Sequence, residues 1–379
     1  MNPMPEWSRV DREWMSRALE LAARGLYTTE PNPRVGCVLV QGAALVGAGW
    51  HVQAGDGHAE VNALAQAGER ARGATAYVTL EPCSHTGKTP PCADALIKAG
   101  VSRVVAAMQD PNPLVAGQGL QRLKDAGISV ECGLLEAQAQ ELNPGFIKRM
   151  QQGLPWVRVK LAMSLDGRTA MASGESKWIT GPAARADVQR LRARSGAVIS
   201  GADSVLLDDS ALTVRASELG LPADEASAAV QRQPLRVLID SLRRVPLDQR
   251  FFRETGPTLV ISTSAEQAAD SYQAIGSELL ALPGDEGKVD LSTVLRTLAE
   301  RGCNEVLVEA GAALSGAFWR AGLVDELIVY MAPRLLGSQA RPLMQLPFES
   351  MSEAMDVAVS DMRAIGQDWR ITARPIFPS

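Results

Sequence analysis

Three short stretches in the first half of the 379-residue chain contain residue types that bind zinc. They are His58-Ala59-Glu60, Cys83 directly after Pro82, and Cys92. One imidazole and two thiolates suit tetrahedral zinc, and three protein ligands leave a fourth position open for water. Zinc lowers the pKa of such a water to near 7, and Glu60 stands where it can carry the proton. We therefore predict a catalytic zinc site with His58, Cys83 and Cys92 as ligands and Glu60 as the proton carrier.

The order of these stretches indicates which hydrolytic reaction the zinc would serve. A His-x-Glu tripeptide followed by Pro-Cys after a strand is typical of zinc deaminases. The spacing departs from the common pattern, because eight residues separate Cys83 from Cys92 where two are usual. The alternative is two buried free thiols and a surface histidine. The Pro-rich, polar segment between the cysteines favours the zinc site, because buried thiols would stand on an apolar stripe.

Composition limits the classes of partner and compartment. The net charge is −5 and the pI is near 5.5, which argues against nucleic-acid binding because that requires a basic face. No apolar run approaches the roughly 20 residues of a membrane-spanning helix. Five cysteines are too few for a disulfide framework, and their odd number would leave one unpaired. Cys37, Cys132 and Cys303 are therefore expected to be packing residues. We expect a soluble, cytoplasmic protein with no nucleic-acid or membrane partner.

Apolar periodicity predicts the elements that position the zinc site. The first 150 residues alternate between helical and strand patterns, with a rigid loop at Pro31-Asn32-Pro33. This alternation predicts a three-layer α/β domain with a partly parallel sheet. Helices are expected at 10–23, 58–71, 91–99, 119–126 and 135–148. Strands are expected at 35–40, 45–49, 74–80, 101–108 and 128–132.

The alternation restarts beyond 143–155, which is the best candidate for a domain boundary. We expect a zinc-dependent deaminase domain over 1–150 and a second α/β domain over 151–379. The segment 217–233 is expected to be a surface loop or a short helix. Strands are expected at 156–162, 197–201, 235–240, 258–262, 305–309 and 326–331. Helices are expected at 183–195, 291–301 and 313–321.

The first half also resembles a known family. The stretches that carry the resemblance are Pro31-Asn32-Pro33-x-Val35-Gly36-Cys37-Val38, His58-Ala59-Glu60 and the run from Thr79 to Cys92. They resemble the deaminase half of the bifunctional RibD family of riboflavin biosynthesis, in which a long gap between the cysteines is normal. The resemblance implies a cytidine-deaminase-like fold, zinc on the three ligands named above, and substrate contacts at Asn32 and His51.

Two histidines near these stretches allow other interpretations. His51 follows an expected strand, and it could equally be a hydrogen-bonded histidine of the core or of a loop. His85 is close to Cys83, but His58 already completes three ligands. We therefore interpret His85 as a loop or substrate-contacting residue.

The second half contains a strand that runs into a small-residue turn and a helix, Val306 to Gly311 and onward. A helix N-terminus after such a turn lets backbone N–H groups approach a phosphate. The G-x-G-x-x-G fingerprint is absent, and a plain strand–helix turn is the alternative. The residues alone are thus consistent both with a nucleotide site and with a plain strand–helix turn.

Four stretches of this half, Lys160 to Arg168, Ser176 to Gly181, Gly201 to Arg215 and Val306 to Gly311, resemble the reductase half of the same family. The resemblance implies a dihydrofolate-reductase-like fold that uses NADPH. The sequence departs from the family's usual pattern at two positions, Ser210 and Ala310. Both are small changes that concern local turn geometry. The implied NADPH contacts are Ala162, Trp178, Ser204, Asp208, Ser241, Gly311, Ala312, Ala313, Leu314, Ser315, Gly316 and Ala317. The implied substrate contacts are Ser176, Arg192, Leu212, Arg215 and Glu309, where arginines suit a ribose phosphate.

The leading hypothesis is a bifunctional enzyme of riboflavin biosynthesis with small phosphoribosylaminopyrimidine substrates. It deaminates 2,5-diamino-6-(5-phosphoribosylamino)pyrimidin-4-one and then reduces the ribosyl group of 5-amino-6-(5-phosphoribosylamino)uracil with NADPH. The alternatives are a deaminase of RNA or nucleosides with a degenerate partner domain, and a non-catalytic zinc-stabilised scaffold. We also expect a homo-oligomer, a dimer or a tetramer. The strand at 327–331 is either an edge strand used in dimerisation or an internal strand.

Overall fold

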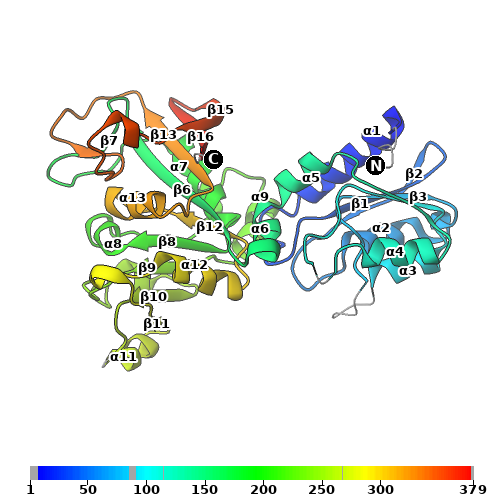
Figure 1. The fold of residues 1–379 in the computed structure, drawn as a ribbon, viewed down its shortest axis with the longest axis horizontal. Coiled ribbons are helices and arrows are strands. Elements are labelled where there is room, and N and C mark those ends of the chain that lie inside the picture. The colour runs from blue at the N-terminus through cyan, green and yellow to red at the C-terminus, as the bar shows by residue number, and fades with distance from the viewer. Residues whose placement is uncertain (1–6, 85–90, 114, 267, 377–379) are drawn as a thin grey trace. The chain divides into compact units, whose positions relative to one another are not determined.

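The structure is a computed structural model that describes residues 7–84, 91–113, 115–266 and 268–376. The chain divides into two compact units, Met1–Gly153 and Leu154–Ser379. Their elements are labelled in Figure 1. His85 lies outside the described residues.

The first unit is built on a five-stranded sheet of order β2-β1-β3-β4-β5. β1 is antiparallel to both β2 and β3, whereas β3, β4 and β5 run parallel. The expected partly parallel sheet is therefore confirmed. The strands are β1 (Gly36–Gln41), β2 (Ala44–Trp50), β3 (Thr75–Val78), β4 (Arg103–Ala106) and β5 (Ser129–Cys132).

Helices cover both faces of this sheet and make the three expected layers (Figure 1). Alternate strand residues point to opposite faces, so Cys37 and Leu39 join one apolar cluster and Val38 and Val40 the other. One face packs against α1 (Arg9–Ala23) and α5 (Glu136–Leu142). The other packs against α2 (Ala59–Ala67), α3 (Cys92–Ala99) and α4 (Gln118–Asp125).

Glycines in β2 allow α2 to lie unusually close to the sheet. A Cβ at Gly47 would stand 2.3 Å from the Ala63 carbonyl oxygen, and one at Gly49 would stand 2.5 Å from the Ala63 nitrogen. No side chain fits at these positions, so backbone approaches backbone. This close packing fixes the start of α2, where the predicted zinc ligand His58 lies.

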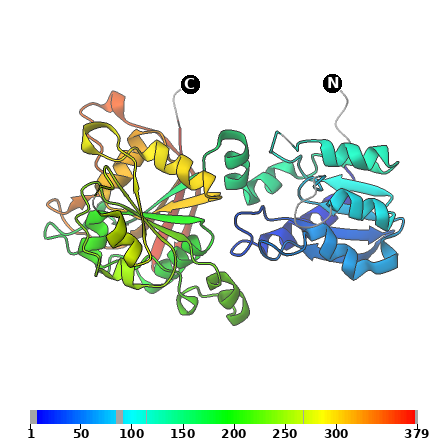
Figure 2. The same ribbon diagram turned by 90° about the horizontal axis from the view of Figure 1, so that it is seen from below.

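The second unit contains a nine-stranded sheet of order β11-β10-β9-β8-β12-β6-β13-β16-β15. Neighbouring strands from β11 to β13 in this order are parallel. The pairs β13–β16 and β16–β15 are antiparallel. Figure 2 shows these strands rotated against one another, as expected for a twisted mixed sheet. The strands are β6 (Trp156–Ser164), β8 (Ala197–Gly201), β9 (Leu235–Ile239), β10 (Thr258–Ser262), β11 (Glu278–Ala281), β12 (Glu305–Val308), β13 (Glu326–Ala332), β15 (Val357–Ile365) and β16 (Asp368–Pro375).

Helices again pack on both faces of this sheet. α7 (Pro182–Ala193) and α8 (Ala202–Asp208) pack on one face, and α12 (Leu291–Glu300) and α13 (Ala312–Arg320) on the other. A separate two-stranded sheet pairs β7 (Arg168–Ala170) with β14 (Arg341–Pro342). Shorter helices are α9 (Ala223–Val230), α10 (Arg250–Arg253) and α11 (Ala269–Ala274). Single 3₁₀ turns are Gly68–Ala71, Ala216–Glu218, Asp285–Gly287 and Met351–Glu353.

Several predicted boundaries are wrong for identifiable reasons. The helix expected at 135–148 is two helices, because Pro144 opens a new helix, α6 (Pro144–Gln152), and Asn143 between them is not helical. The Asn143 side chain instead bonds the backbone of Arg34. The helix expected at 58–71 leaves α-helical geometry at Gly68, whose φ is +57°.

The strand expected at 327–331 is internal. β13 pairs with β6 on one side and with β16 on the other, so its use as a dimer edge is excluded. The hairpin of β15 and β16 that covers it was not predicted. Within 217–233 the short-helix alternative is confirmed by α9. None of the helices in the described parts of the chain has the length and apolar character needed to cross a bilayer.

Candidate active sites

The three predicted zinc ligands meet at the ends of two helices of the first unit. His58 is the residue before α2, Cys92 is the first residue of α3, and Cys83 lies in the segment after β3. His58 Nδ1 lies 3.2 Å from Cys92 Sγ and 3.6 Å from Cys83 Sγ. Their ligand atoms all lie within 4.8 Å of one another. One nitrogen and two sulfurs facing a common point fit the donor set of a zinc site with an open fourth position.

The electrostatics of the cluster favour both metal binding and proton transfer. Hydrogen bonds from Cys92 and His58 hold the pKa of the Cys83 thiol well below its usual range, which favours the thiolate form that binds zinc. Glu60, in the first turn of α2, is only 3% exposed. Burial raises the pKa of this carboxyl to about 7. A group that exchanges its proton near neutrality suits the proton-carrier role.

Asn32 and His51 lie beside the cluster and bond each other. The Asn32 amide nitrogen is 3.0 Å from His51 Nε2, and His51 Nδ1 is 3.2 Å from the Gly57 carbonyl oxygen. Burial lowers the pKa of His51, so the ring is neutral, with Nδ1–H donating to Gly57 and Nε2 accepting from Asn32. The His51 and His58 rings meet edge-on with centroids 5.5 Å apart. His51 is thus a hydrogen-bonded, buried histidine that also orients Asn32 beside the metal ligands.

Sequence reasoning missed Glu81, which anchors the segment that carries Cys83. Its buried carboxylate accepts hydrogen bonds from the backbone N–H groups of Asp110, Gly117, Gly119 and Leu120 at 2.8–3.2 Å. The only signal in the sequence was a pair of glycines at the start of α4, Gly117 before the helix and Gly119 in its first turn. Gly119 packs against Pro82 so tightly that a Cβ would stand 1.9 Å from the Pro82 carbonyl oxygen.

The second unit holds a cleft of about 1720 Å³ at the carboxyl ends of β6, β8, β9 and β12. Ligands of open α/β sheets bind at this end of the strands. The cleft is lined by all the residues implied as substrate contacts and by all those implied as NADPH contacts except Ser315 and Gly316. Those two lie on the packed side of α13, where Ser315 is buried and a Cβ at Gly316 would stand 2.4 Å from the Gln345 carbonyl oxygen.

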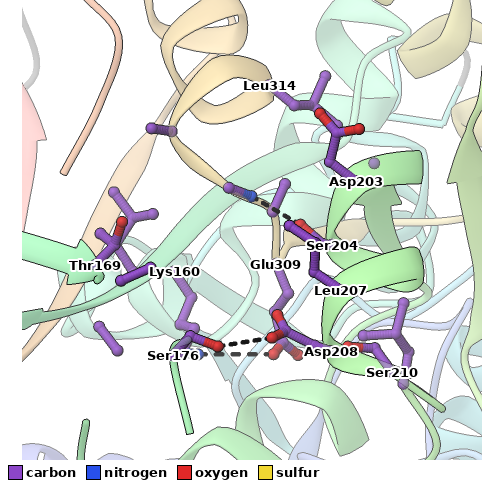
Figure 3. Close-up of a pocket in the computed structure, with 18 of the residues that line it drawn as sticks. Lys160, Thr169, Ser176, Asp203, Ser204, Leu207, Asp208, Ser210, Glu309 and Leu314 are labelled. Atoms are coloured by element: carbon purple, nitrogen blue, oxygen red, sulfur yellow. Dashed lines mark hydrogen bonds and ion pairs between the residues drawn. The ribbon is translucent and has the colours of Figure 1, made fainter. Parts of the chain in front are cut away.

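The cleft floor is a charged network rather than a set of unpaired arginines. Arg192 makes a bidentate ion pair with Glu309, at 2.5 and 2.9 Å. Lys160 Nζ lies 3.8 Å from the same carboxylate (Figure 3). Burial opposes the charge on Glu309, yet Arg192 and Lys160 hold the pKa of Glu309 below its usual range. Arg215 is likewise paired, with Glu218 at 2.7 Å. Lys160 was not singled out from the sequence, although a second basic residue, two positions after Arg158 in a mostly apolar strand, was a signal.

Hydrogen bonds join the expected cofactor contacts to one another and to Ser176, an expected substrate contact, around the cleft. Ser204 Oγ accepts a hydrogen bond from the Gly311 N–H at 3.0 Å, and the Ser176 hydroxyl donates to Asp208 at 2.6 Å (Figure 3). Trp178 is 62% exposed at the cleft, with the Arg185 guanidinium 4.6 Å from its ring centroid.

The two departures from the family pattern, Ser210 and Ala310, both line the cleft. The backbone around Ser210 is left-handed at Asp209 (φ +46°) and Leu212 (φ +57°). Local turn geometry at this point is therefore set by residues other than glycine.

Comparison with known proteins matches both units. Residues 8–108 match the family described as the cytidine and deoxycytidylate deaminase zinc-binding region, and residues 155–371 match the RibD C-terminal domain. Riboflavin biosynthesis protein RibD of Escherichia coli K12 is 52% identical over 364 residues, which cover 94% of this chain and 97% of that protein. RibD of Haemophilus influenzae is 50% identical over 376 residues, which cover 98% of this chain and 99% of that protein.

Two solved structures are similar over nearly their whole length. Acinetobacter baumannii RibD has a TM-score of 0.89 at 50% identity, covering 97% of this chain and 99% of that one. The diaminohydroxyphosphoribosylaminopyrimidine deaminase/5-amino-6-(5-phosphoribosylamino)uracil reductase of Thermotoga maritima has a TM-score of 0.84 at 32% identity, with the same coverage.

Proposed function

Because this chain belongs to the RibD family of riboflavin biosynthesis proteins, we propose that it performs two successive reactions on one pyrimidine. The chain is a bifunctional enzyme with a zinc-binding deaminase domain and an NADPH-dependent reductase domain. Its first substrate is 2,5-diamino-6-(5-phosphoribosylamino)pyrimidin-4-one, and its second is 5-amino-6-(5-phosphoribosylamino)uracil. This assignment replaces the RNA-deaminase and scaffold alternatives. The domains are 1–150 and 151–379, which is close to the division of the structure after Gly153.

The observation that supports the deaminase assignment most strongly is the meeting of His58, Cys83 and Cys92 beside a buried glutamate. Zinc bound by these ligands supplies a water whose pKa is lowered to about 7. Glu60 takes a proton from the attacking water and passes it to the ring nitrogen and then to the leaving amine. Water and the amino-substituted ring carbon thus give a ring carbonyl and ammonia. Asn32, oriented by His51, contacts the pyrimidine ring.

In the reductase domain, NADPH supplies the hydride that converts the ribosyl group to ribityl. The N-terminus of α13, with Ser204 bonded to Gly311, holds the cofactor phosphates. Ser176, Arg192, Leu212, Arg215 and Glu309 contact the phosphoribosyl substrate, and Lys160 lies beneath them on the floor of the cleft. The domain acts mainly by alignment of two bound molecules, which agrees with a large cleft whose described lining contains no histidine and no cysteine.

We further propose that the protein forms a homo-oligomer, a dimer or a tetramer, in the cytoplasm. Support for association comes from the edge hairpin, where Val359, Met362 and Trp369 are exposed. Light scattering of the purified chain measures the mass directly. A monomer at micromolar concentration would contradict this proposal.

Metal analysis combined with a two-stage assay tests the proposed function. We expect about one zinc per chain, ammonia release from the diaminopyrimidine, and then loss of NADPH absorbance as the uracil product is reduced. Supplying the uracil directly should restore NADPH oxidation in a chain whose zinc has been removed. Ammonia release without NADPH oxidation would overturn the reductase half, and NADPH oxidation without ammonia release would overturn the deaminase half.

A further inference from the structure

The loop 209–215 carries two of the implied substrate contacts, Leu212 and Arg215, along one side of the reductase cleft. Figure 3 shows it leaving α8 at Ser210. The loop is neither helix nor strand, yet its residues 211–214 are all buried. Buried backbone N–H and C=O groups need hydrogen-bond partners, and a loop outside a helix or sheet takes them from side chains of other segments. The shape of this loop therefore depends on residues outside it.

The backbone of the loop is left-handed at two residues that have side chains. φ is +46° at Asp209 and +57° at Leu212. Leucine rarely adopts such values, which persist only where the surrounding structure imposes them. A released loop would relax toward ordinary backbone angles and move Leu212 and Arg215 from their places at the cleft. The side chains that hold the loop thus decide where these two contacts lie.

Gln233 holds the loop with both ends of its amide, at the residue between Thr213 and Arg215. Its Oε1 accepts a hydrogen bond from the Val214 N–H at 2.9 Å, and its Nε2 donates to the Val214 carbonyl oxygen at 3.0 Å. This pair of bonds imitates one step of a β-ladder, with a side chain in place of a strand. The same Nε2 also donates to the Val230 carbonyl oxygen at 3.5 Å. Gln233 itself is not among the described residues that line the cleft.

Two other side chains that bond the loop have additional tasks. Gln189 of α7 accepts from the Arg215 N–H and donates to Glu218, both at 3.1 Å, but it also lines the cleft. Arg236 donates to one loop carbonyl and to three carbonyls elsewhere, and it is fully buried, so it also supports the fold. Gln233 is therefore the residue whose hold on the loop is most cleanly removed.

We infer that Gln233 is a positioning residue of the reductase: it keeps Leu212 and Arg215 against the phosphoribosyl substrate and sets the affinity for that substrate but not for NADPH. This role rests on the proposed reductase function. The phosphate that Arg215 would bind is attached at the far end of the sugar from the carbon that accepts the hydride. Its binding is therefore the same in the ground state and the transition state, so its loss raises KM and leaves kcat nearly unchanged.

Gln233→Met tests the role by removing both bonds to Val214 while keeping a side chain of similar length. KM for 5-amino-6-(5-phosphoribosylamino)uracil should rise by about 10-fold or more, because small misplacements of binding groups are costly. We expect kcat to change by less than about threefold and KM for NADPH by less than about twofold. Loss of NADPH absorbance with the full-length chain measures all three. An equal rise in both KM values, or a fall in kcat alone, would overturn the inference.

A double-mutant cycle distinguishes positioning through Arg215 from a general weakening of the fold. Arg215→Met alone should raise KM for the uracil by about 10- to 100-fold, because it removes a charge-assisted contact to phosphate. In that background Gln233→Met should add less than about threefold, since the residue that it positions no longer binds the phosphate. If the two effects multiply in full, Gln233 does not act through Arg215 and the inference fails.

Hydrogen exchange reports on the loop without turnover. Amides of the loop 209–215 should exchange at least about tenfold faster in Gln233→Met, because the Val214 N–H loses its acceptor. Gln231→Met is the matched control. Gln231 is exposed, donates to the Ser227 carbonyl oxygen at 3.4 Å and does not line the cleft, so its loss should leave loop exchange and both KM values unchanged. Unchanged loop exchange in Gln233→Met would contradict the inference.

A milder variant keeps the test valid if Gln233→Met does not fold. Gln233→Asn retains the amide on a side chain one methylene group shorter, so it too should raise KM for the uracil more than KM for NADPH. If the wild type does not oxidise NADPH with the uracil substrate, the reductase assignment itself fails. If the wild type is active and the Gln233 variants exchange faster in the loop but keep the wild-type KM for the uracil, only the positioning role is overturned.

Discussion

The two active sites are built in opposite ways. The candidate deaminase site is a small cluster in which each side chain has a proposed chemical task, with three ligand atoms within 4.8 Å of one another and one buried glutamate. The reductase site is a cleft of about 1720 Å³ whose charged residues are mostly paired with one another. In the proposed function, Glu60 of the chain carries protons beside the zinc in the first site, whereas NADPH brings the hydride to the second. A single substitution should therefore remove deamination, but should only weaken reduction.

Glu60→Gln is the strongest test of this contrast. Loss of the proton carrier should reduce deamination by about 10²–10⁴-fold, because general acid–base catalysis contributes that much. Zinc content should stay unchanged, since the three ligands are intact. Ammonia release and metal content are measured on the same sample, with NADPH oxidation on the uracil substrate as the internal control. A matching loss of reductase activity would show that the two sites are not independent.

Glu309→Gln tests the reductase side. It leaves Arg192 and Lys160 facing each other without a carboxylate, and breaking a buried ion pair costs about 3–5 kcal/mol of stability. We expect reductase kcat/KM to fall by about 10- to 100-fold, which is less than the loss in Glu60→Gln.

The matched control for Glu309→Gln is Glu305→Gln, at the start of the strand β12 that ends just before Glu309. Glu305 is 1% exposed and pairs with Arg158 and Arg194, but it does not line the cleft. This variant should lose similar stability while it keeps reductase activity at a temperature where both variants are folded. Equal losses of activity would mean that the network only supports the fold.

Glu81→Gln tests whether the three predicted zinc ligands depend on the backbone hydrogen bonds that Glu81 accepts. The glutamine amide would place its own N–H group against backbone N–H donors, which would then lack an acceptor. This loss costs about 1–3 kcal/mol of folding stability. Because Glu81 anchors the segment with Cys83, zinc should be lost to a chelator about 10-fold faster than from the wild type. Competition with a chromophoric chelator measures this rate. An unchanged rate would show that the ligands hold their positions without Glu81.

Asp11→Asn should have the smallest effect, confined to the stability of the deaminase domain. Burial alone would raise the pKa of Asp11, but hydrogen bonds from Arg103, Ser8 and Tyr77 hold it at about 2. Since the folded pKa lies below the unfolded value of about 3.9, this carboxylate stabilises the fold above that pH. At pH 7 the variant should lose about 1–2 kcal/mol, and the difference should shrink as the pH falls from about 4 through 2.

Hydrogen exchange of α1 in the full-length chain measures the effect of Asp11→Asn, and amides of β9 and β10 serve as the control. Both sites should keep their activity at pH 7. A difference that grows toward low pH would contradict the assigned sign of the pKa shift.

Much of the fold was predictable because strand and helix periodicity is local. The alternation of elements, the position of α1 and the end of α3 at Gly100 follow from patterns within a few residues. The split at Pro144 was also visible locally, although the apolar pattern across it suggested one helix. The hairpin of β15 and β16 was missed because its exposed strands lack a strong apolar alternation.

The sequence by itself predicted the three zinc ligands and the glutamate that would carry the proton, and the family resemblance supplied the two proposed reactions. Those features depend on residue type and short spacing, and the family resemblance rests on the same motifs. Only the tertiary structure decided that Arg192 is paired with Glu309, that His51 orients Asn32, and that β13 is internal. Each of these contacts joins residues far apart in the chain, and their meeting depends on strand order and helix packing. Residue spacing does not encode that order, because many sheet arrangements accommodate the same local pattern.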